Sequence, residues 1–183
     1  MPVTNPANPG RKTPRSGIKV VDNADDPVAH PGVNTTMGRA GYLLAGNFAD
    51  VEYLELLPDT YIPEYPHEAE CILYTVKGKW VLCSERRRRI VEPGTLCRVE
   101  AGTDVGYEVP FDGPSFVLIF RASEAACDED RFVDYLAGLA FKLKARQYDK
   151  NTCRISDLPE EHPAKVFARS LDQIRPYEQY GKN

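Results

Sequence analysis

Short apolar segments that alternate with polar residues and turn residues run from Gly41 to Phe120 and predict β-strands. Strands are expected in the segments 42–44, 51–56, 71–76, 80–83, 96–99, 106–109 and 116–120. Turn residues separate these segments at short intervals, at positions that include Pro58, Gly78, Gly94 and Gly102. Many short strands with this punctuation are typical of a β-sandwich or a small barrel.

Two of the turns are predicted in more detail. Lys77-Gly78 lies between segments 71–76 and 80–83 and predicts a hairpin, with Gly78 at positive φ. The charged run from Glu85 to Arg89 is expected to be an exposed turn. In an acidic chain, the arginines of this run are interpreted as solvated, edge-protecting residues rather than as a nucleic-acid site.

The pattern becomes helical after Ser123. Apolar residues at helical spacing predict an amphipathic helix over 128–146, with acidic residues at its start and basic residues at its end. A second helix is expected from Pro163 to about Ile174, where Arg175-Pro176 would stop it. Both helices belong to the part of the chain that follows the strands.

The first 30 residues are rich in Pro, Asn, Gly and Asp and predict a flexible arm, with an arm that wraps a partner subunit as the alternative. The expected organisation is therefore an arm over 1–30, a β-barrel over 31–123 and a helical extension over 124–183. The length of 183 residues and the hydrophobic content of 42% suit one domain with such extensions.

Charge and composition exclude several classes of partner. The net charge of −4 argues against a nucleic-acid binder and gives no attraction to anionic membranes. No apolar run is long enough to span a bilayer, and the N-terminus lacks the apolar core of a secretory signal, so a cytoplasmic location is expected. Five cysteines without a CxxC pair predict free thiols rather than disulfides or a zinc knuckle.

Two stretches, YIPEYPHEAECILYTVKG over 61–78 and EPGTLCRVEAGTDVGYEV over 92–109, resemble the two motifs of the cupin superfamily. The first cupin motif carries two histidines, a glutamate and a glycine; with Gly78 as that glycine, the other positions hold Tyr65, His67 and Cys71. In the second motif Gly94 and Gly102 keep the turns, while Glu100 replaces the proline, Val105 the third histidine and Val109 the asparagine.

This resemblance covers residues 42–121 and implies a mainly β fold. The expected form is a cupin-like antiparallel β-barrel, also called a double-stranded β-helix or jelly roll, with a C-terminal α-helical extension. The resemblance further implies a small-molecule ligand and a homodimer; no nucleic-acid or membrane partner is expected.

The departures from the motifs bear on metal binding. Only His67 keeps its residue among the four ligand positions, whereas a Mn, Fe or Ni site needs three or four oxygen and imidazole ligands. No cofactor is therefore expected, and purified protein should carry well under one equivalent of these metals. The alternative is a divalent ion held by His67 and Cys71 with help from Glu70. Otherwise Cys71 is a small buried apolar residue.

Tyr65, His67 and Cys71 share one strand parity and are expected to face the barrel interior, whereas Glu68 and Glu70 should face outwards. His67 is a candidate general acid or base with Tyr65 as its catalytic partner, or else a hydrogen-bonded structural histidine. Side chains expected to line a substrate pocket are Tyr53, Cys71, Val105 and Tyr107; for each tyrosine, packing within the barrel is the alternative.

Three functions remain open from the sequence. The favoured one is a cupin-type enzyme that performs metal-independent acid–base chemistry on a small molecule, as an isomerase, lyase, dehydratase or cyclase. The second is a metal-dependent oxygenase with a site built on His67 and Cys71. The third is a non-catalytic small-molecule-binding or dimerising module, because one fold supports many functions.

Overall fold

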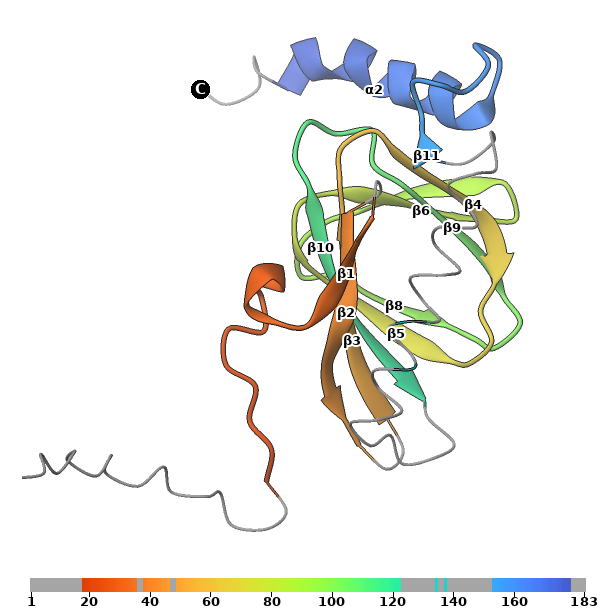
Figure 1. Ribbon diagram of the computed structural model, residues 1–183. Helices are drawn as coiled ribbons and strands as arrows, with labels where there is room; N and C mark the ends of the chain where they lie inside the picture. Colours follow the sequence, from red (N-terminus) through yellow and green to blue (C-terminus); the bar gives the residue numbers. More distant parts are fainter. Residues whose placement is uncertain are drawn as a thin grey trace, which may run out of the picture.

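A computed structural model describes residues 18–35, 38–46, 49–122, 134, 137 and 153–178. The described strands form two antiparallel sheets, shown in Figure 1. Sheet A has the order β1-β2-β3-β10-β5-β8, and sheet B has the order β11-β4-β9-β6-β7. The strands are β1 (Gly32–Thr35), β2 (Gly38–Ala45), β3 (Ala49–Leu56), β4 (Thr60–Pro66), β5 (Cys71–Lys77), β6 (Trp80–Ser84), β7 (Arg87–Val91), β8 (Leu96–Val99), β9 (Asp104–Glu108), β10 (Ser115–Ala122) and β11 (Cys153–Arg154).

The strand order is that of a jelly roll. Between β3 and β10 the chain passes from one sheet to the other at almost every connection, so that β3-β10-β5-β8 faces β4-β9-β6-β7. Two four-stranded sheets linked in this way make the double-sheet barrel of the jelly-roll class. The predicted fold class is confirmed, including the absence of helix between Val51 and Phe120 in the described residues.

The predicted hairpin over 71–83 is wrong. β5 pairs with β10 and β8, whereas β6 pairs with β7 and β9 in the other sheet. Gly78 does have the predicted positive φ, of 71°, but it turns the chain across the barrel edge. A Cβ at Gly78 would lie 2.1 Å from the carbonyl oxygen of Pro114, so this corner requires glycine.

The turn predicted from Glu85 to Arg89 is also shorter in the structure. Glu85 and Arg86 alone make the turn, at φ values of 51° and 62°, and Arg87 already begins β7. The twist of paired strands favours two-residue turns with positive φ at both positions, and here non-glycine residues adopt this conformation.

The core lies between the two sheets. Trp80 is fully buried, stacks on Tyr107 with ring centroids 5.3 Å apart, and donates a hydrogen bond from Nε1 to Thr75 Oγ1 at 2.9 Å. Thr75 belongs to sheet A and Trp80 to sheet B, so this bond joins the sheets across the core. The indole is thereby buried without an unpaired donor.

The last residues of the N-terminal arm contact the barrel. Residues 1–17 of the predicted arm lie outside the described part of the chain. Pro27–Ala29 form a short 3-10 helix, η1, and Arg39 donates hydrogen bonds to the carbonyl oxygens of Pro27 and His30 at 2.9 and 2.8 Å. The end of the arm is therefore fixed on sheet A, while the arm over 18–22 runs away from the barrel (Figure 1).

The C-terminal extension docks at one end of the barrel. β11 pairs with the start of β4, and α2 (Pro163–Glu178) lies across this end (Figure 1). Of the helix predicted over 128–146, only Asp134 and Ala137 are described, both helical; the rest lies outside the described residues.

The predicted stop of the second helix at Arg175-Pro176 is wrong, because α2 continues to Glu178. Proline removes one hydrogen bond of the last turn, and only two residues of the helix follow it. No helix of the described chain is both long and apolar enough to cross a membrane.

Candidate functional site

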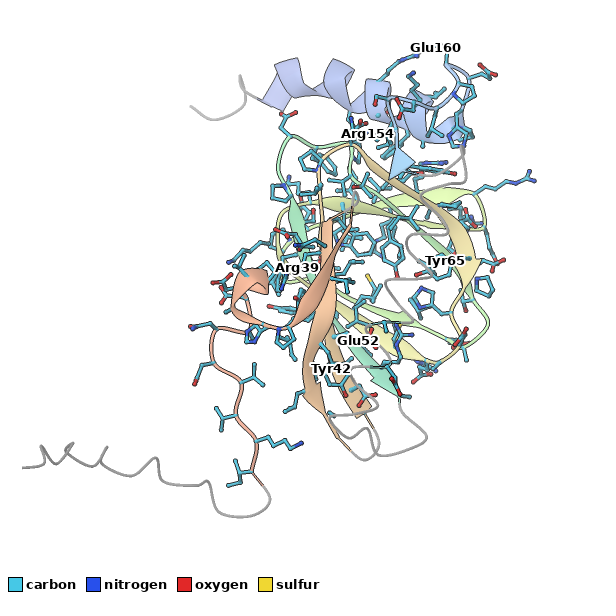
Figure 2. The ribbon with its side chains drawn as sticks, viewed as in Figure 1. Arg39, Tyr42, Glu52, Tyr65, Arg154 and Glu160 are labelled. Carbon is cyan, nitrogen blue, oxygen red and sulfur yellow. The ribbon has the colours of Figure 1, made fainter. Side chains whose placement is uncertain are left out.

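A cluster of polar and aromatic side chains lies between the sheets at the end of the barrel opposite α2. The ends of β4 and β10 and the starts of β3, β5 and β9 meet here, because neighbouring strands are antiparallel. This His67 cluster comprises Glu52, Tyr65, His67, Cys71, Tyr107 and Arg121. Figure 2 shows Glu52 and Tyr65 on opposite sheets.

His67 is fixed directly after the end of β4. Its backbone N–H donates to the carbonyl oxygen of Thr103 at 3.1 Å, and its own carbonyl accepts from the N–H of Gly102 at 2.7 Å. Gly102 turns the chain at a φ of 80°, which brings the second motif beside the first. The side chain of His67 is 3% exposed and points into the barrel.

Both ring nitrogens of His67 have partners. The hydroxyl of Tyr107 lies 3.0 Å from Nε2, and Sγ of Cys71 lies 3.5 Å from Nδ1. Cys71 begins β5 in sheet A, whereas Tyr65 and His67 come from the β4 side in sheet B. The three residues do face one interior, as predicted, but from two sheets rather than from one strand.

Burial sets the protonation of this cluster. Desolvation, followed by the nearby charge of Arg121, lowers the pKa of His67, so the imidazole is neutral at neutral pH. Burial also raises the pKa of the Cys71 thiol and raises that of Tyr107 well above its usual range. The cluster therefore holds three neutral groups that can each give or accept a hydrogen bond.

Aromatic contacts complete one wall. Tyr65 stacks on His67 with centroids 5.2 Å apart, and its ring lies 6.4 Å from that of Tyr107. Tyr65 is partly buried, whereas Tyr107 is 1% exposed. Among these two tyrosines, Tyr65 is the one that solvent reaches.

An ion pair lies on the facing wall. Arg121 donates from Nε to Glu52 Oε1 at 3.1 Å and from Nη2 to Glu52 Oε2 at 3.2 Å. Glu52 is 5% exposed, and Arg121 is the cross-strand partner of Cys71. Such a two-point contact fixes the guanidinium in one orientation. Neither residue was identified from the sequence, although the alternation around Glu52 could have indicated an inward carboxylate.

The predicted pocket residues separate into two groups. Cys71, Val105 and Tyr107 lie in the barrel interior, each no more than 2% exposed. Tyr53 is also buried but lies on the outer face of sheet A, where its single hydroxyl hydrogen has the carbonyl oxygens of Pro31 at 3.1 Å and Pro27 at 3.2 Å within reach. The placement of Tyr53 in the pocket is wrong, because it alternates with the inward Glu52 on β3.

The glutamates of the first motif face outwards as predicted. Glu68 and Glu70 are both exposed, and Glu70 accepts hydrogen bonds from Arg98 on the surface.

A second buried ion pair lies outside the barrel interior. Arg88 of β7 donates three hydrogen bonds to Glu108 of β9, which is 1% exposed on the outer side of sheet B. Arg88 was predicted as a solvated turn residue, which is wrong. Burial and Glu108 together raise the pKa of the neighbouring Cys83 thiol. This pair links β7 to β9 within sheet B and lies on the side of the sheet that faces away from His67.

The described residues do not fit a metal ion. No group of three or more His, Cys, Asp or Glu side chains comes together in the part of the chain that the structure describes. His67 and Cys71 supply two donors, Glu52 is bonded to Arg121, and Val105 cannot coordinate.

Comparison with known proteins gives structural similarity at low sequence identity. No family model matches the chain, and no curated protein matches it. The polyketide cyclase RemF from Streptomyces resistomycificus has a TM-score of 0.44 and 17% identity, over 57% of this chain and 82% of that one.

Two further solved structures have similar values. KdgF from Halomonas sp. has a TM-score of 0.47 and 16% identity, over 52% of this chain and 89% of that one. An RmlC-like cupin from Methanocaldococcus jannaschii, described as a double-stranded β-helix, has a TM-score of 0.46 and 14% identity, over 58% and 92%. These values assign no activity to this chain. Its own strand order, with Gly78 and Gly102 at the motif turns, gives it the double-stranded β-helix fold of the cupins.

Proposed function

We propose that this protein is a small-molecule enzyme that performs metal-independent acid–base chemistry at the His67 cluster. Isomerase, lyase, dehydratase and cyclase reactions all need a positioned acid and base away from bulk water. The observation that carries the proposal is a neutral His67 bonded to two proton-bearing groups beside the Glu52–Arg121 pair. Buried polar groups stabilise a core less than apolar ones do, so their concentration here favours a chemical role.

In this proposal Nδ1 of His67 is the reacting atom. Its partner is the Cys71 thiol, a weak donor at 3.5 Å, which a substrate group can displace at small cost. Nε2 keeps the stronger contact with Tyr107 at 3.0 Å. With its hydrogen on Nε2, His67 donates to the Tyr107 oxygen and accepts a substrate proton at Nδ1.

The reverse proton transfer starts from the imidazolium that forms when Nδ1 takes the substrate proton. Nδ1 then returns a proton to the substrate, and His67 becomes neutral again with its hydrogen still on Nε2. The Tyr107 oxygen accepts from Nε2–H in both states and so holds this orientation of the ring. The raised pKa of Tyr107 keeps its hydroxyl protonated throughout.

Tyr65 and Arg121 take the remaining roles. Tyr65 stacks over His67 at the solvent side and would hold a planar or unsaturated ligand against the imidazole. Arg121, fixed by Glu52, would stabilise negative charge that develops on the ligand when His67 removes a proton. A substrate with an acidic C–H next to a carbonyl group suits this arrangement.

One alternative has a specific observation in its favour. His67 is 3% exposed with both nitrogens bonded, which is also the geometry of a structural histidine. In that case the barrel is a binding module without turnover.

Proton exchange at carbon tests the proposal, because every reaction of this class begins or ends with a proton transfer. Small carbonyl and hydroxy acids that raise the melting temperature of the protein would be incubated with it in D₂O, and deuterium uptake at carbon would be followed by NMR. Wild-type protein should catalyse uptake into at least one such ligand. His67→Gln should reduce the rate by about a hundred- to ten-thousand-fold.

The matched control is Glu108→Gln, which changes a buried polar side chain on the outer side of sheet B. This variant should keep the wild-type exchange rate. Binding without exchange, or full exchange in His67→Gln, would reject the proposal and favour the binding module.

A further inference from the structure

Cys71 adds a thiol nucleophile to the His67 cluster, and the proposed function uses this thiol only as a contact that the substrate displaces. Its Sγ lies 3.5 Å from Nδ1 of His67. On the other side of the imidazole, Nε2 lies 3.0 Å from the Tyr107 hydroxyl. A nucleophile, a base and a third group that orients the base therefore lie in one row. Enzymes activate serine and cysteine nucleophiles with this arrangement.

The hydrogen-bond pattern makes Nδ1 a base toward the thiol. With its hydrogen on Nε2, the ring donates to the Tyr107 oxygen and presents the lone pair of Nδ1 to the S–H group of Cys71. Burial lowers the pKa of His67 and raises the pKa of Cys71, so the two groups rest as a neutral imidazole and a neutral thiol. A thiol with a raised pKa gives a more nucleophilic sulfur once its proton is removed.

A positive group lies close to the place where negative charge would form after attack by the sulfur. Arg121 is the cross-strand partner of Cys71, and its contact with Glu52 holds the guanidinium in the barrel interior. The side chain of Arg121 is 26% exposed, and Tyr65, which stacks on His67, is also partly exposed. Solvent therefore reaches one side chain of the cluster on each sheet.

We propose that Cys71 is a covalent site, at which His67 is the base for addition of the thiol to an α,β-unsaturated carbonyl compound. The groups around the sulfur select this class of reagent. A flat conjugated system fits against the rings of Tyr65 and His67, and its carbonyl oxygen gains negative charge beside Arg121 during the addition. This activity goes beyond the proposed function, because it forms a bond to the protein and needs no turnover.

The addition is balanced within the site. Sγ of Cys71 forms a bond to the β-carbon while its proton moves to Nδ1 of His67. The electron pair of the carbon–carbon double bond shifts toward the carbonyl group, and Arg121 stabilises the enolate that results. His67 then gives the proton on Nδ1 to the α-carbon. The products are a neutral thioether and a neutral imidazole, and no further reagent takes part.

The other thiols that the structure describes provide internal comparisons. Cys97 is partly exposed, whereas Cys71 is 1% and Cys83 3% exposed. Exposure alone would therefore make Cys97 the most reactive of the three. Among the hydrogen bonds of the described residues, only that of Cys71 joins a thiol to a histidine. Cys83 instead lies beside the carboxylate of Glu108, whose charge opposes loss of the thiol proton.

Labelling of the full chain in its native state with methyl vinyl ketone tests the proposal. Peptide mapping by mass spectrometry follows each cysteine separately in one sample. Cys71 should react about tenfold faster than Cys97 or more, against the order of exposure. His67→Gln should slow the reaction of Cys71 by about a hundredfold or more, the contribution of a general base, and should leave the rate at Cys97 unchanged.

Two results would overturn the proposal. Faster labelling of Cys97 than of Cys71 in the wild-type protein would do so without any variant, and would mean that Cys71 is a buried apolar residue. A rate at Cys71 that His67→Gln does not change would show that the imidazole is not the base. The rate at Cys97 in this variant serves as the control for an intact fold.

Covalent labelling and the proton exchange of the proposed function can be told apart. Labelling requires the contact between Cys71 and His67 but no turnover. Fast labelling of Cys71 without deuterium exchange into any ligand would support the covalent site and reject the proposed function. Deuterium exchange together with slow labelling of Cys71 would do the reverse.

Discussion

Individual side chains of the His67 cluster are held in neutral forms by burial and by each other. The imidazole, the Cys71 thiol and the Tyr107 hydroxyl form one hydrogen-bonded row, and the only charges in the cluster are those of Glu52 and Arg121. Low local polarity makes each of these contacts stronger than it would be in water, and makes an unpaired member costly.

The free energy of unfolding should decrease as the pH falls below about 6.5, the ordinary pKa of histidine. As the pH falls, His67 is protonated in the unfolded chain at a higher pH than in the native protein, because burial lowers its pKa in the native state. The free energy of unfolding therefore decreases between the ordinary pKa and the lowered native pKa, with a slope of at most about 1.4 kcal/mol per pH unit. Urea unfolding at several pH values should find this contribution in wild-type protein and not in His67→Gln; identical curves would contradict the assignment.

Breaking the interior ion pair on one side should be more damaging than removing both partners. Arg121→Met leaves the carboxylate of Glu52, 5% exposed, without its bidentate partner and should cost about 3–5 kcal/mol of stability. The double variant Glu52→Leu/Arg121→Met removes both charges and should be markedly more stable than the single one. Chemical denaturation of both proteins measures the order, and the reverse order would show that Glu52 has another strong partner.

At this scale the sequence identified His67, Cys71, Tyr65 and Tyr107 as interior residues, because strand parity is a local property. It missed Glu52 and Arg121, since their contact joins β3 and β10 across a separation that only the sheet order reveals. Tyr53 was misplaced because apolar residues occupy both faces of β3, and the outer face is covered by residues 27–31.

Among the elements, tight turns at positive φ control how strands enter the two sheets. Gly78 makes the corner between β5 and β6, and Gly94 makes the turn before β8. The two glycines differ in their surroundings: a Cβ at Gly78 would meet backbone within 2.1 Å, whereas a Cβ at Gly94 would have nothing within 4 Å.

This difference gives a matched pair of variants. Gly94→Ala should lose about 1–2 kcal/mol of stability, the cost of a left-handed conformation for a residue with a Cβ. Gly78→Ala should lose more than that, because the corner must also move away from the Pro114 carbonyl. Thermal or urea unfolding of the two proteins provides the comparison. Equal losses of stability would mean that the backbone around Gly78 shifts at little cost.

Element positions were predicted better than element pairing. The strand segments from 51–56 to 116–120 all correspond to observed strands, because β-forming residues and turn residues are local signals. The prediction of a hairpin over 71–83 was wrong because turn residues do not indicate whether the strand after a tight turn pairs with the strand before it or enters the opposite sheet. The predicted end of α2 was also wrong, because a single proline is tolerated in the last turn of a helix.

At the scale of the whole molecule, the two ends of the barrel differ in structure. The end opposite the His67 cluster is covered by the C-terminal segment, which Asp59 holds in place. The carboxylate of Asp59 accepts hydrogen bonds from the backbone N–H of Ser156 at 2.9 Å and from Ser156 Oγ at 2.5 Å. The segment is then held together by Lys165, which donates to the carbonyl oxygens of Ser156 and Leu158.

Asp59→Gly should release this segment without disturbing the site. Glycine keeps the φ of 67° found at residue 59 but removes both side-chain contacts with Ser156. Hydrogen exchange should become faster over 155–171 and stay slow in β5 and β10. Asp59→Asn, which keeps one acceptor oxygen, should have a smaller effect. Unchanged exchange would indicate that the pairing of β11 with β4 suffices to hold the segment.

The position of β10 has a consequence for synthesis on the ribosome. β10 lies between β3 and β5, the two strands that it pairs with over most of their length, yet it is made last among the eight strands of the two facing sheets, β3-β10-β5-β8 and β4-β9-β6-β7. Until residue 122 has left the exit tunnel, β3 and β5 each present an open edge that other nascent chains can pair with. A pause in translation before this point would therefore favour aggregation, whereas a pause after it would allow the barrel to close.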